Sequence, residues 1–252
     1  MTTIGIATTN KQCVMMSESG ITDENFITSM PMNKIIRQGE FLIAAAGADR
    51  VCDVLQYLVK YPAVPPQLKK KEDYMSWYQW IAKRIIPLIR KVAQEQLTLD
   101  VKDGVAELPD SELILVTHGK AFSISNTLGI SRCSPYWAIG SGGSLALGSL
   151  ATAYRQQKQN WDTHHPTYLY EAIQTAITHD SFSHPPIYGW VSNTNGTIKE
   201  WDSKDLVSTA AHSLKKETAA KNTKANTLPN LTKDANQTEH TIQVITEEDQ
   251  NK

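Results

Sequence analysis

The residues at the start of the chain could together perform nucleophilic catalysis. Met1 is followed by Thr2, and a small second residue is normally exposed when the initiator methionine is removed. Thr2 would then carry both a hydroxyl nucleophile and a free α-amine, whose pKa of about 7.7–8.0 suits a general base near neutral pH. A threonine activated by its own amine is one established type of activated nucleophile. Taken alone, a Met-Thr opening strongly favours an ordinary chain start, because many proteins begin in this way.

A carboxylate and a lysine follow Thr2 at equal spacing, as Glu18 and Lys34. A lysine beside the threonine would lower the pKa values of its hydroxyl and amine, and a carboxylate beside that lysine would hold it charged and in place. Gly47 ends the run Ala44-Ala45-Ala46. Its backbone N–H, unshielded by a side chain, could face an oxyanion. Without such neighbours Lys34 would be an ordinary solvated lysine at a sheet edge.

The elements that must position these residues are predicted to be β-hairpins separated by helices. Alternating apolar and β-branched residues indicate strands, whereas apolar residues three or four apart indicate helices. Pro62 is expected to end the first helix, and Pro87 to kink the long aromatic second one. The predicted strands cover residues 3–8, 12–16, 34–37, 40–46, 112–117, 121–125, 137–140, 187–192 and 197–201, and the predicted helices cover 51–58, 74–92, 144–154 and 168–178.

This order of elements predicts an α+β fold. Two antiparallel sheets packed face to face, with a pair of helices on each outer side, would form a four-layer αββα sandwich. Composition changes near residue 204, and the rest is rich in polar residues with almost no aromatics. We therefore expect one domain over residues 1–204 and a mostly disordered tail over 205–252. Residues 242–245 are apolar enough for a docking peptide, although a solvated tail is the favoured interpretation.

Several short motifs follow one another along residues 1–200, beginning with Met1-Thr2-Thr3-Ile4 and Val14-Met15-Met16-Ser17-Glu18-Ser19. The alanine-glycine segment 44–49 and the run Ile139-Gly140-Ser141-Gly142-Gly143 come later, followed by the Asp-x-x-Ser pair Asp180 and Ser183. In this order they resemble the motifs of proteasome β-subunit-type N-terminal-nucleophile (Ntn) hydrolases. The resemblance is greatest to the bacterial two-component (HslV-like) peptidase, the partner of an ATP-driven unfoldase.

The resemblance implies a catalytic set and a substrate-binding set. Thr2 would be the nucleophile, Gly47 the oxyanion donor, and Ser141 with the Asp-x-x-Ser pair would support the threonine amine. Without the resemblance, Ser141 would mark a tight turn and Asp180 the end of a helix. The implied catalytic residues are Thr2, Glu18, Lys34, Gly47, Ser141, Asp180 and Ser183, and the implied substrate-binding residues are Thr22, Ala46 and Ala48.

The chain departs from the family pattern in two places. The family carries Asp where this chain has Glu18, so pairing with Lys34 requires the geometry to adjust by one methylene. Residues 68–109 also form a longer connection than the family leads one to expect between the first helices and the middle strands. The first departure bears on activity and the second on how subunits would pack.

The resemblance implies a threonine endopeptidase that works in a homo-oligomeric ring in the cytoplasm, cleaves peptides or unfolded proteins, and pairs with an ATP-driven unfoldase. Two alternatives remain open at this point: a catalytically inactive ring component, for which Glu18 would mark decay, and an Ntn amidase acting on a small amide. A precursor segment ahead of the threonine, common in small-amide members, is not expected here.

Composition argues against several other classes of function. The formal net charge is −1 and basic residues are dispersed, so neither nucleic acid nor a membrane surface is an expected partner. The odd set of isolated cysteines, Cys13, Cys52 and Cys133, indicates reduced thiols rather than a disulfide framework. The histidines lack metal-ligand spacing and are interpreted as loop residues. We expect no metal and no cofactor.

Overall fold

The computed structural model describes residues 2–23, 26–28 and 31–202. The predictions for the tail, including the docking peptide at 242–245, lie outside these residues. Across the described ranges, no helix combines the length and the apolar character needed to cross a bilayer.

The first sheet is built around the start of the chain. Strands β1 (Thr3–Thr8) and β2 (Gln12–Ser17) form a hairpin, and β12 (Tyr136–Gly140) pairs with the other side of β1. Strands β13 (Tyr188–Asn193) and β14 (Ile198–Glu200) complete the antiparallel order β12-β1-β2-β13-β14. Thr3 lies opposite Gly140 and Ile4 opposite Ser17, so the ends of β12 and β2 flank Thr2.

The second sheet supplies the other wall of the site. Its antiparallel order is β11-β10-β9-β6-β5. Two further hairpins, which the sequence did not lead us to predict, lie outside both sheets. The strands of the second sheet are β5 (Ile35–Gln38), β6 (Phe41–Ala46), β9 (Glu112–Thr117), β10 (Lys120–Ile124) and β11 (Ile130–Arg132), and the extra hairpins pair β3 (Ile21–Asp23) with β4 (Phe26–Thr28) and β7 (Asp100–Lys102) with β8 (Val105–Glu107).

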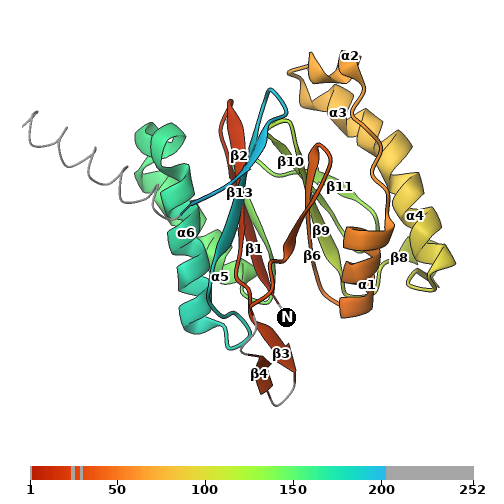
Figure 1. Ribbon diagram of the computed structural model, residues 1–252, viewed down its shortest axis with the longest axis horizontal. Coiled ribbons are helices and arrows are strands. Elements are labelled where there is room, and N and C mark those ends of the chain that lie inside the picture. Colours follow the sequence, from red (N-terminus) through yellow and green to blue (C-terminus); the bar gives the residue numbers. More distant parts are fainter. Residues whose placement is uncertain (1, 24–25, 29–30, 203–252) are drawn as a thin grey trace, which may run out of the picture. The chain divides into compact units, whose positions relative to one another are not determined.

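Helices cover the outer faces of both sheets, as Figure 1 shows. The first group follows β6 and lies on the second sheet, and the second group follows β12 and lies on the first sheet. The first group contains α1 (Asp49–Asp53), η1 (Val54–Leu58), α2 (Pro66–Lys69), α3 (Tyr74–Trp80), η2 (Ile81–Ile85) and α4 (Ile86–Glu95), and the second contains α5 (Gly143–Gln156), η3 (Lys158–Asn160) and α6 (Trp161–His179).

Three buried apolar clusters separate the four layers. Ile6 and Met15 of the first sheet pack against Leu42 and Ile114 of the second sheet. The outer clusters lie between each sheet and its helices and include Trp77 on one side and Ile173 on the other. Burial of these large apolar side chains is the main favourable contribution to folding. The predicted four-layer αββα sandwich is confirmed.

Two prolines act on the helices in different ways. Ahead of Pro87 the helix widens into the π-type turn η2, because proline lacks the N–H for the regular ladder and its ring clashes with the preceding turn. The predicted start of α6 at residue 168 was wrong, since α6 begins at Trp161 and contains Pro166. Trp161 is buried and donates from Nε1 to the Thr8 carbonyl over 2.9 Å, so tertiary contacts fix this earlier start.

Candidate active site

Thr2 and Lys34 meet because they lie at the same end of the two packed sheets. Thr2 directly precedes β1 of the first sheet, and Lys34 directly precedes β5 of the second. Lys34 Nζ donates to Thr2 Oγ1 over 2.9 Å, and both residues are buried at 7% and 8% relative exposure. A lysine ammonium at this distance stabilises negative charge that develops on the threonine oxygen.

Glu18 follows β2 and forms an ion pair with Lys34 through Oε1. Its side chain is fully buried, and its oxygens accept three further hydrogen bonds from backbone amides. Thr3 donates to Oε1 over 3.3 Å, whereas Gly20 and His184 donate to Oε2 over 2.7 and 3.0 Å. A buried carboxylate with four donors is well satisfied as an anion. Glu18 therefore pairs with Lys34 despite its extra methylene.

A hydroxyl network lies on the other side of the nucleophile. Ser141 Oγ lies 2.8 Å from Asp180 Oδ2 and 3.4 Å from the Thr2 carbonyl oxygen. Ser183 Oγ donates to the same Asp180 oxygen over 2.6 Å and lies 2.6 Å from Thr3 Oγ1. Since Ser183 has a single hydroxyl proton, Thr3 is the donor in the second contact. Three residues predicted from the sequence therefore lie beside Thr2 and Thr3.

Glycines allow this close approach of backbone and side chains. A Cβ at Gly140 would overlap the Thr2 carbonyl, and one at Gly142 would overlap Thr3 Oγ1. Gly140 also has φ +91°, a conformation that other residues rarely adopt. Ser141 was predicted from this motif, whereas no role was predicted for the glycines around it. Their function is to let the turn between β12 and α5 pack directly on Thr2.

The predicted oxyanion donor lies at the end of β6. Ala46 is the last residue of that strand, and its Cβ would lie 3.4 Å from a Cβ added at Gly140. Gly47 follows with φ +134°, and a side chain there would overlap the Asp110 carbonyl. Ala48 is half-buried, and its N–H donates to Ser111 Oγ over 3.2 Å. Residues 46–48 thus occupy the same end of the sandwich as Thr2 and Lys34.

Thr22, the remaining predicted substrate contact, lies in β3 opposite Ile27 of β4. This hairpin extends from the same end of the molecule as the N-terminus, as Figure 1 shows.

Several residues of the site were missed by the sequence analysis. Thr3 takes part through its hydroxyl and its amide, and Gln56 in η1 donates to the Lys34 carbonyl over 2.7 Å. Gly20 and His184 contribute only backbone amides. The spacing of amino acids carries no signal for backbone donors. Gln56 alone gave a hint, as a polar residue within the predicted apolar helix.

No cysteine side chain and no histidine side chain contributes one of the contacts described above. Burial raises the pKa of Cys133 to about 12 and that of Cys52 to about 11, so these thiols are weak nucleophiles. The interpretation of the histidines as loop residues was wrong for His164, His165 and His179, which lie in α6. Over the residues that the structure describes, no group of three or more potential ligands could hold a metal ion.

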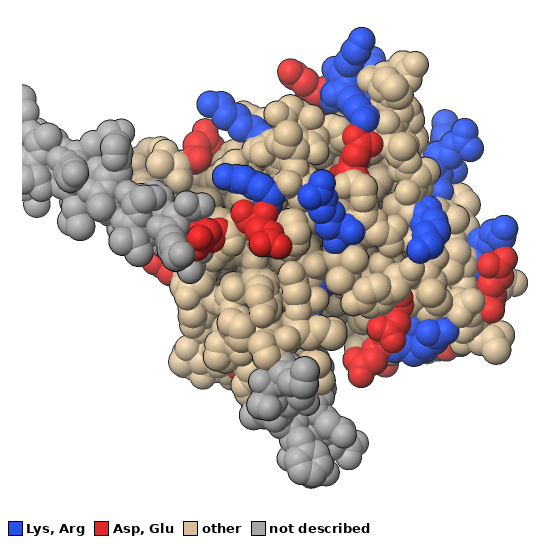
Figure 2. Space-filling model, in the orientation of Figure 1, with Lys and Arg blue, Asp and Glu red and all other residues tan. Residues whose placement is uncertain are grey.

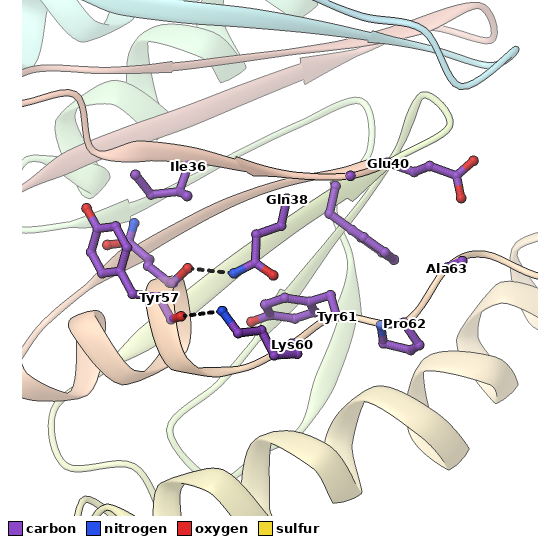
Figure 3. A pocket seen from close by; sticks show the side chains of 11 residues that line it. Ile36, Gln38, Glu40, Tyr57, Lys60, Tyr61, Pro62 and Ala63 are labelled. Carbon is purple, nitrogen blue, oxygen red and sulfur yellow. Dashed lines mark hydrogen bonds between the residues drawn. The ribbon is translucent and has the colours of Figure 1, made fainter.

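A cavity of about 510 Å³ lies beside β5 and η1 and is drawn in Figure 3. Tyr57, Tyr61 and Gln38 line it, and none of the predicted site residues does. Gln56, which donates to the Lys34 carbonyl, also lines this cavity, whereas neither Thr2 nor Lys34 does.

No family model and no curated protein matches the chain. Solved structures do match. A structure of BPH from Thiobacillus denitrificans has a TM-score of 0.59 at 18% identity, over 76% of this chain and 98% of that one. The same protein in complex with epoxomicin gives a TM-score of 0.57 at the same identity and coverage.

HslV from Trypanosoma brucei matches with a TM-score of 0.52 at 16% identity, over 76% of this chain and 99% of that one. In each case nearly the whole neighbour aligns with 76% of this chain. These similarities and the two helix-covered antiparallel sheets show that the chain has the proteasome-type Ntn-hydrolase fold.

Proposed function

We propose that the protein is a threonine endopeptidase whose nucleophile is Thr2, exposed after removal of Met1. The observation that carries this proposal is the contact of 2.9 Å between Lys34 Nζ and Thr2 Oγ1, with the ammonium held by the buried Glu18. Such a lysine stabilises an alkoxide better than it stabilises a neutral hydroxyl. The contact therefore favours the transition state for attack by threonine.

In the first step, the α-amine of Thr2 removes the proton from its own hydroxyl. Thr2 Oγ1 then attacks a peptide carbonyl carbon, and a carbon–oxygen bond forms while the carbonyl oxygen becomes an oxyanion. Ser141 Oγ lies beside the Thr2 carbonyl oxygen and Asp180 Oδ2, and the proposed role of this pair is to hold the Thr2 backbone that carries the amine.

In the second step, the amine returns the proton to the leaving nitrogen, and the peptide carbon–nitrogen bond breaks to leave an ester on Thr2. The Gly47 N–H is the proposed donor to the oxyanion, and residues 46–48 with Thr22 are the proposed contacts to the substrate. Water then attacks the ester after losing a proton to the amine, which releases the second product and restores Thr2.

The same proposal includes assembly into a homo-oligomeric ring in the cytoplasm, with an ATP-driven unfoldase as partner. The HslV and BPH similarities support this part at the level of fold. Neither alternative function is favoured by a particular observation. An inactive protein has no need for a nucleophile, a lysine and a carboxylate in contact.

Covalent labelling with epoxomicin tests the proposal, because the Thiobacillus protein was solved in complex with this compound. The intact protein should lack Met1 and should gain the mass of one epoxomicin molecule. Thr2→Ala should remain unlabelled. Thr178→Ala, which removes a threonine from an exposed position of α6, is the matched control and should be labelled like the wild type.

Labelling should map to Thr2 and not to a cysteine, since burial raises the pKa values of the thiols. A chain that keeps Met1 yet hydrolyses peptides would sink the proposed mechanism. Absence of both labelling and hydrolysis in a properly processed chain would favour the inactive alternative. Labelling together with hydrolysis of small amides only would favour the amidase.

A further inference from the structure

A second cavity, of about 840 Å³, lies at the end of the sandwich opposite the catalytic site. It is bounded by the turns of three hairpins and by the connection between α2 and α3, with Asn10, Gly119 and Asn195 among its lining residues. Thr2 precedes the six residues of β1, and Thr9 and Asn10 follow them. At a rise of 3.3 Å per residue, the two sites are about 20 Å apart.

The lining of this cavity is strongly cationic for a chain with a net charge of −1. Lysines and arginines outnumber carboxylates by five to two, although Lys69 forms an ion pair with Glu40. Of the two carboxylates, that of Asp73 accepts the Ser76 N–H as the N-cap of α3. Figure 2 shows basic side chains gathered over α2, at the top of the view.

Two cations converge at the centre of this wall. Arg132 on β11 lies opposite Phe122 of β10, and Lys120 lies two residues before Phe122, so both cations occupy the same face of the sheet. The Arg132 guanidinium lies 3.8 Å from the centre of the Tyr74 ring, and Lys120 Nζ lies 5.4 Å from the centre of the Trp77 ring.

Aromatic rings pack on these cations, whereas Glu72 and Asp73 act on Lys120 only from beyond ion-pair distance. Within the described part of the chain, neither Lys120 nor Arg132 has a carboxylate oxygen within 4 Å. Burial is the main cause that lowers the pKa of Lys120; Glu72 and Asp73 act in the opposite direction, and the charge of Arg132 lowers this pKa further because like charges repel. An anion bound between them would remove this repulsion.

We propose that this cavity binds a small molecule bearing a diphosphate or triphosphate group. Lysines of the α2–α3 connection approach from one side and Lys120 with Arg132 from another, which suits a multiply charged group with many oxygens better than a planar carboxylate. The volume lies within the range of ordinary ligand pockets and exceeds the size of a single phosphate.

Isothermal titration of the whole protein with sodium pyrophosphate, at constant ionic strength, tests this proposal. We expect saturable binding to one site, with sulfate at least tenfold weaker because it carries fewer charges and oxygens. The double variant Lys120→Gln/Arg132→Gln should lower pyrophosphate affinity at least tenfold. The matched control Lys83→Gln/Arg84→Gln removes two exposed charges from η2, outside the cavity, and should stay within twofold.

Lys70→Gln/Lys71→Gln provides a second test if the first variant does not fold, because both lysines are exposed and line the same cavity. It should weaken binding at least threefold. Absence of binding by the wild type, equal binding of sulfate, or equal losses in the control variant would overturn the proposal. So would binding of an oligoglutamate peptide in place of pyrophosphate. None of these results depends on the activity of Thr2.

Discussion

The carboxylate at position 18 is adapted to the longer glutamate side chain. Glu18 Oε1 reaches Lys34 and the Thr3 amide, while Oε2 reaches the amides of Gly20 and His184. We therefore expect Glu18→Asp to lower kcat at least tenfold, although Asp is the residue that the family carries. A side chain shorter by one methylene cannot satisfy both groups of donors, and each lost charge-assisted hydrogen bond costs about 1.5–3 kcal/mol.

Steady-state hydrolysis of a peptide substrate measures this effect, with the thermal midpoint recorded alongside. Glu18→Gln keeps the length of the side chain but loses its charge, so it should be as inactive as Lys34→Ala, which removes the ammonium itself. Faster turnover by Glu18→Asp than by the wild type would show that Glu18 is a suboptimal replacement rather than an adapted one.

His165 gives the protein a pH dependence that is separate from catalysis. It is fully buried in α6, and burial lowers its pKa to about 4. Nδ1 lies 3.2 Å from the Trp161 carbonyl oxygen, and Nε2 lies 3.3 Å from Gln12 Nε2. Between pH 6.5 and 4 the unfolded chain binds a proton at this residue and the native chain does not, so stability falls as the pH is lowered.

The loss should reach roughly 2 kcal/mol at pH 5, from the difference in pKa between the two states. Urea unfolding of the wild type and of His165→Gln at pH 7 and pH 5 checks this prediction. The variant should lose less stability than the wild type over this interval. Equal slopes for the two proteins would mean that His165 is protonated in the native state.

At the scale of elements, η1 fixes the backbone of Lys34, the residue that directly precedes β5. The side chain of Gln56 donates to the Lys34 carbonyl over 2.7 Å, and the backbone carbonyl of Gln56 accepts from Gln38 Nε2 over 2.9 Å. Gln56→Leu removes the first bond at nearly constant volume. We expect kcat to fall several-fold with KM little changed, because Lys34 loses a contact that fixes its backbone but the substrate surface is intact.

The stability of this variant should fall by about 1–3 kcal/mol, since a buried carbonyl loses a donor. Gln79→Leu, at an exposed position of α3, is the matched control and should change neither quantity. A loss of stability without any change in kcat would assign Gln56 a purely structural role.

At the scale of the whole molecule, the order of layers was predictable from the sequence because each hairpin shows its own alternation. The strands at 3–8 and 112–117 were predicted to the residue. The partners of Glu18 were not, because the His184 amide comes from a segment 166 residues away and local patterns contain no such information. The early start of α6 was also hidden, because the predicted apolar face began at residue 168 and local spacing does not show the packing of Trp161.

The last prediction concerns the proposed ring. The proposed cytoplasmic endopeptidase would need its active sites enclosed, and one domain of this size cannot enclose its own active site. Native mass spectrometry and light scattering at micromolar concentration should therefore show a closed homo-oligomer, in which two stacked rings are the expected symmetric arrangement. Thr2→Ala should assemble equally well, because it removes only a small group from the interior of one subunit.

We expect α3 to form part of the contact between subunits of the ring. In this helix Met75 is 65% exposed and Tyr78 is 38% exposed, while Trp77 between them is buried. Met75→Glu would bury a charge in such a contact and should shift the population toward monomers, whereas Gln79→Glu, a neighbouring exposed position on the same helix, should not. A strict monomer in both the wild type and the variants would remove the enclosed chamber. The small-amide hydrolase would then be the better account of the threonine site.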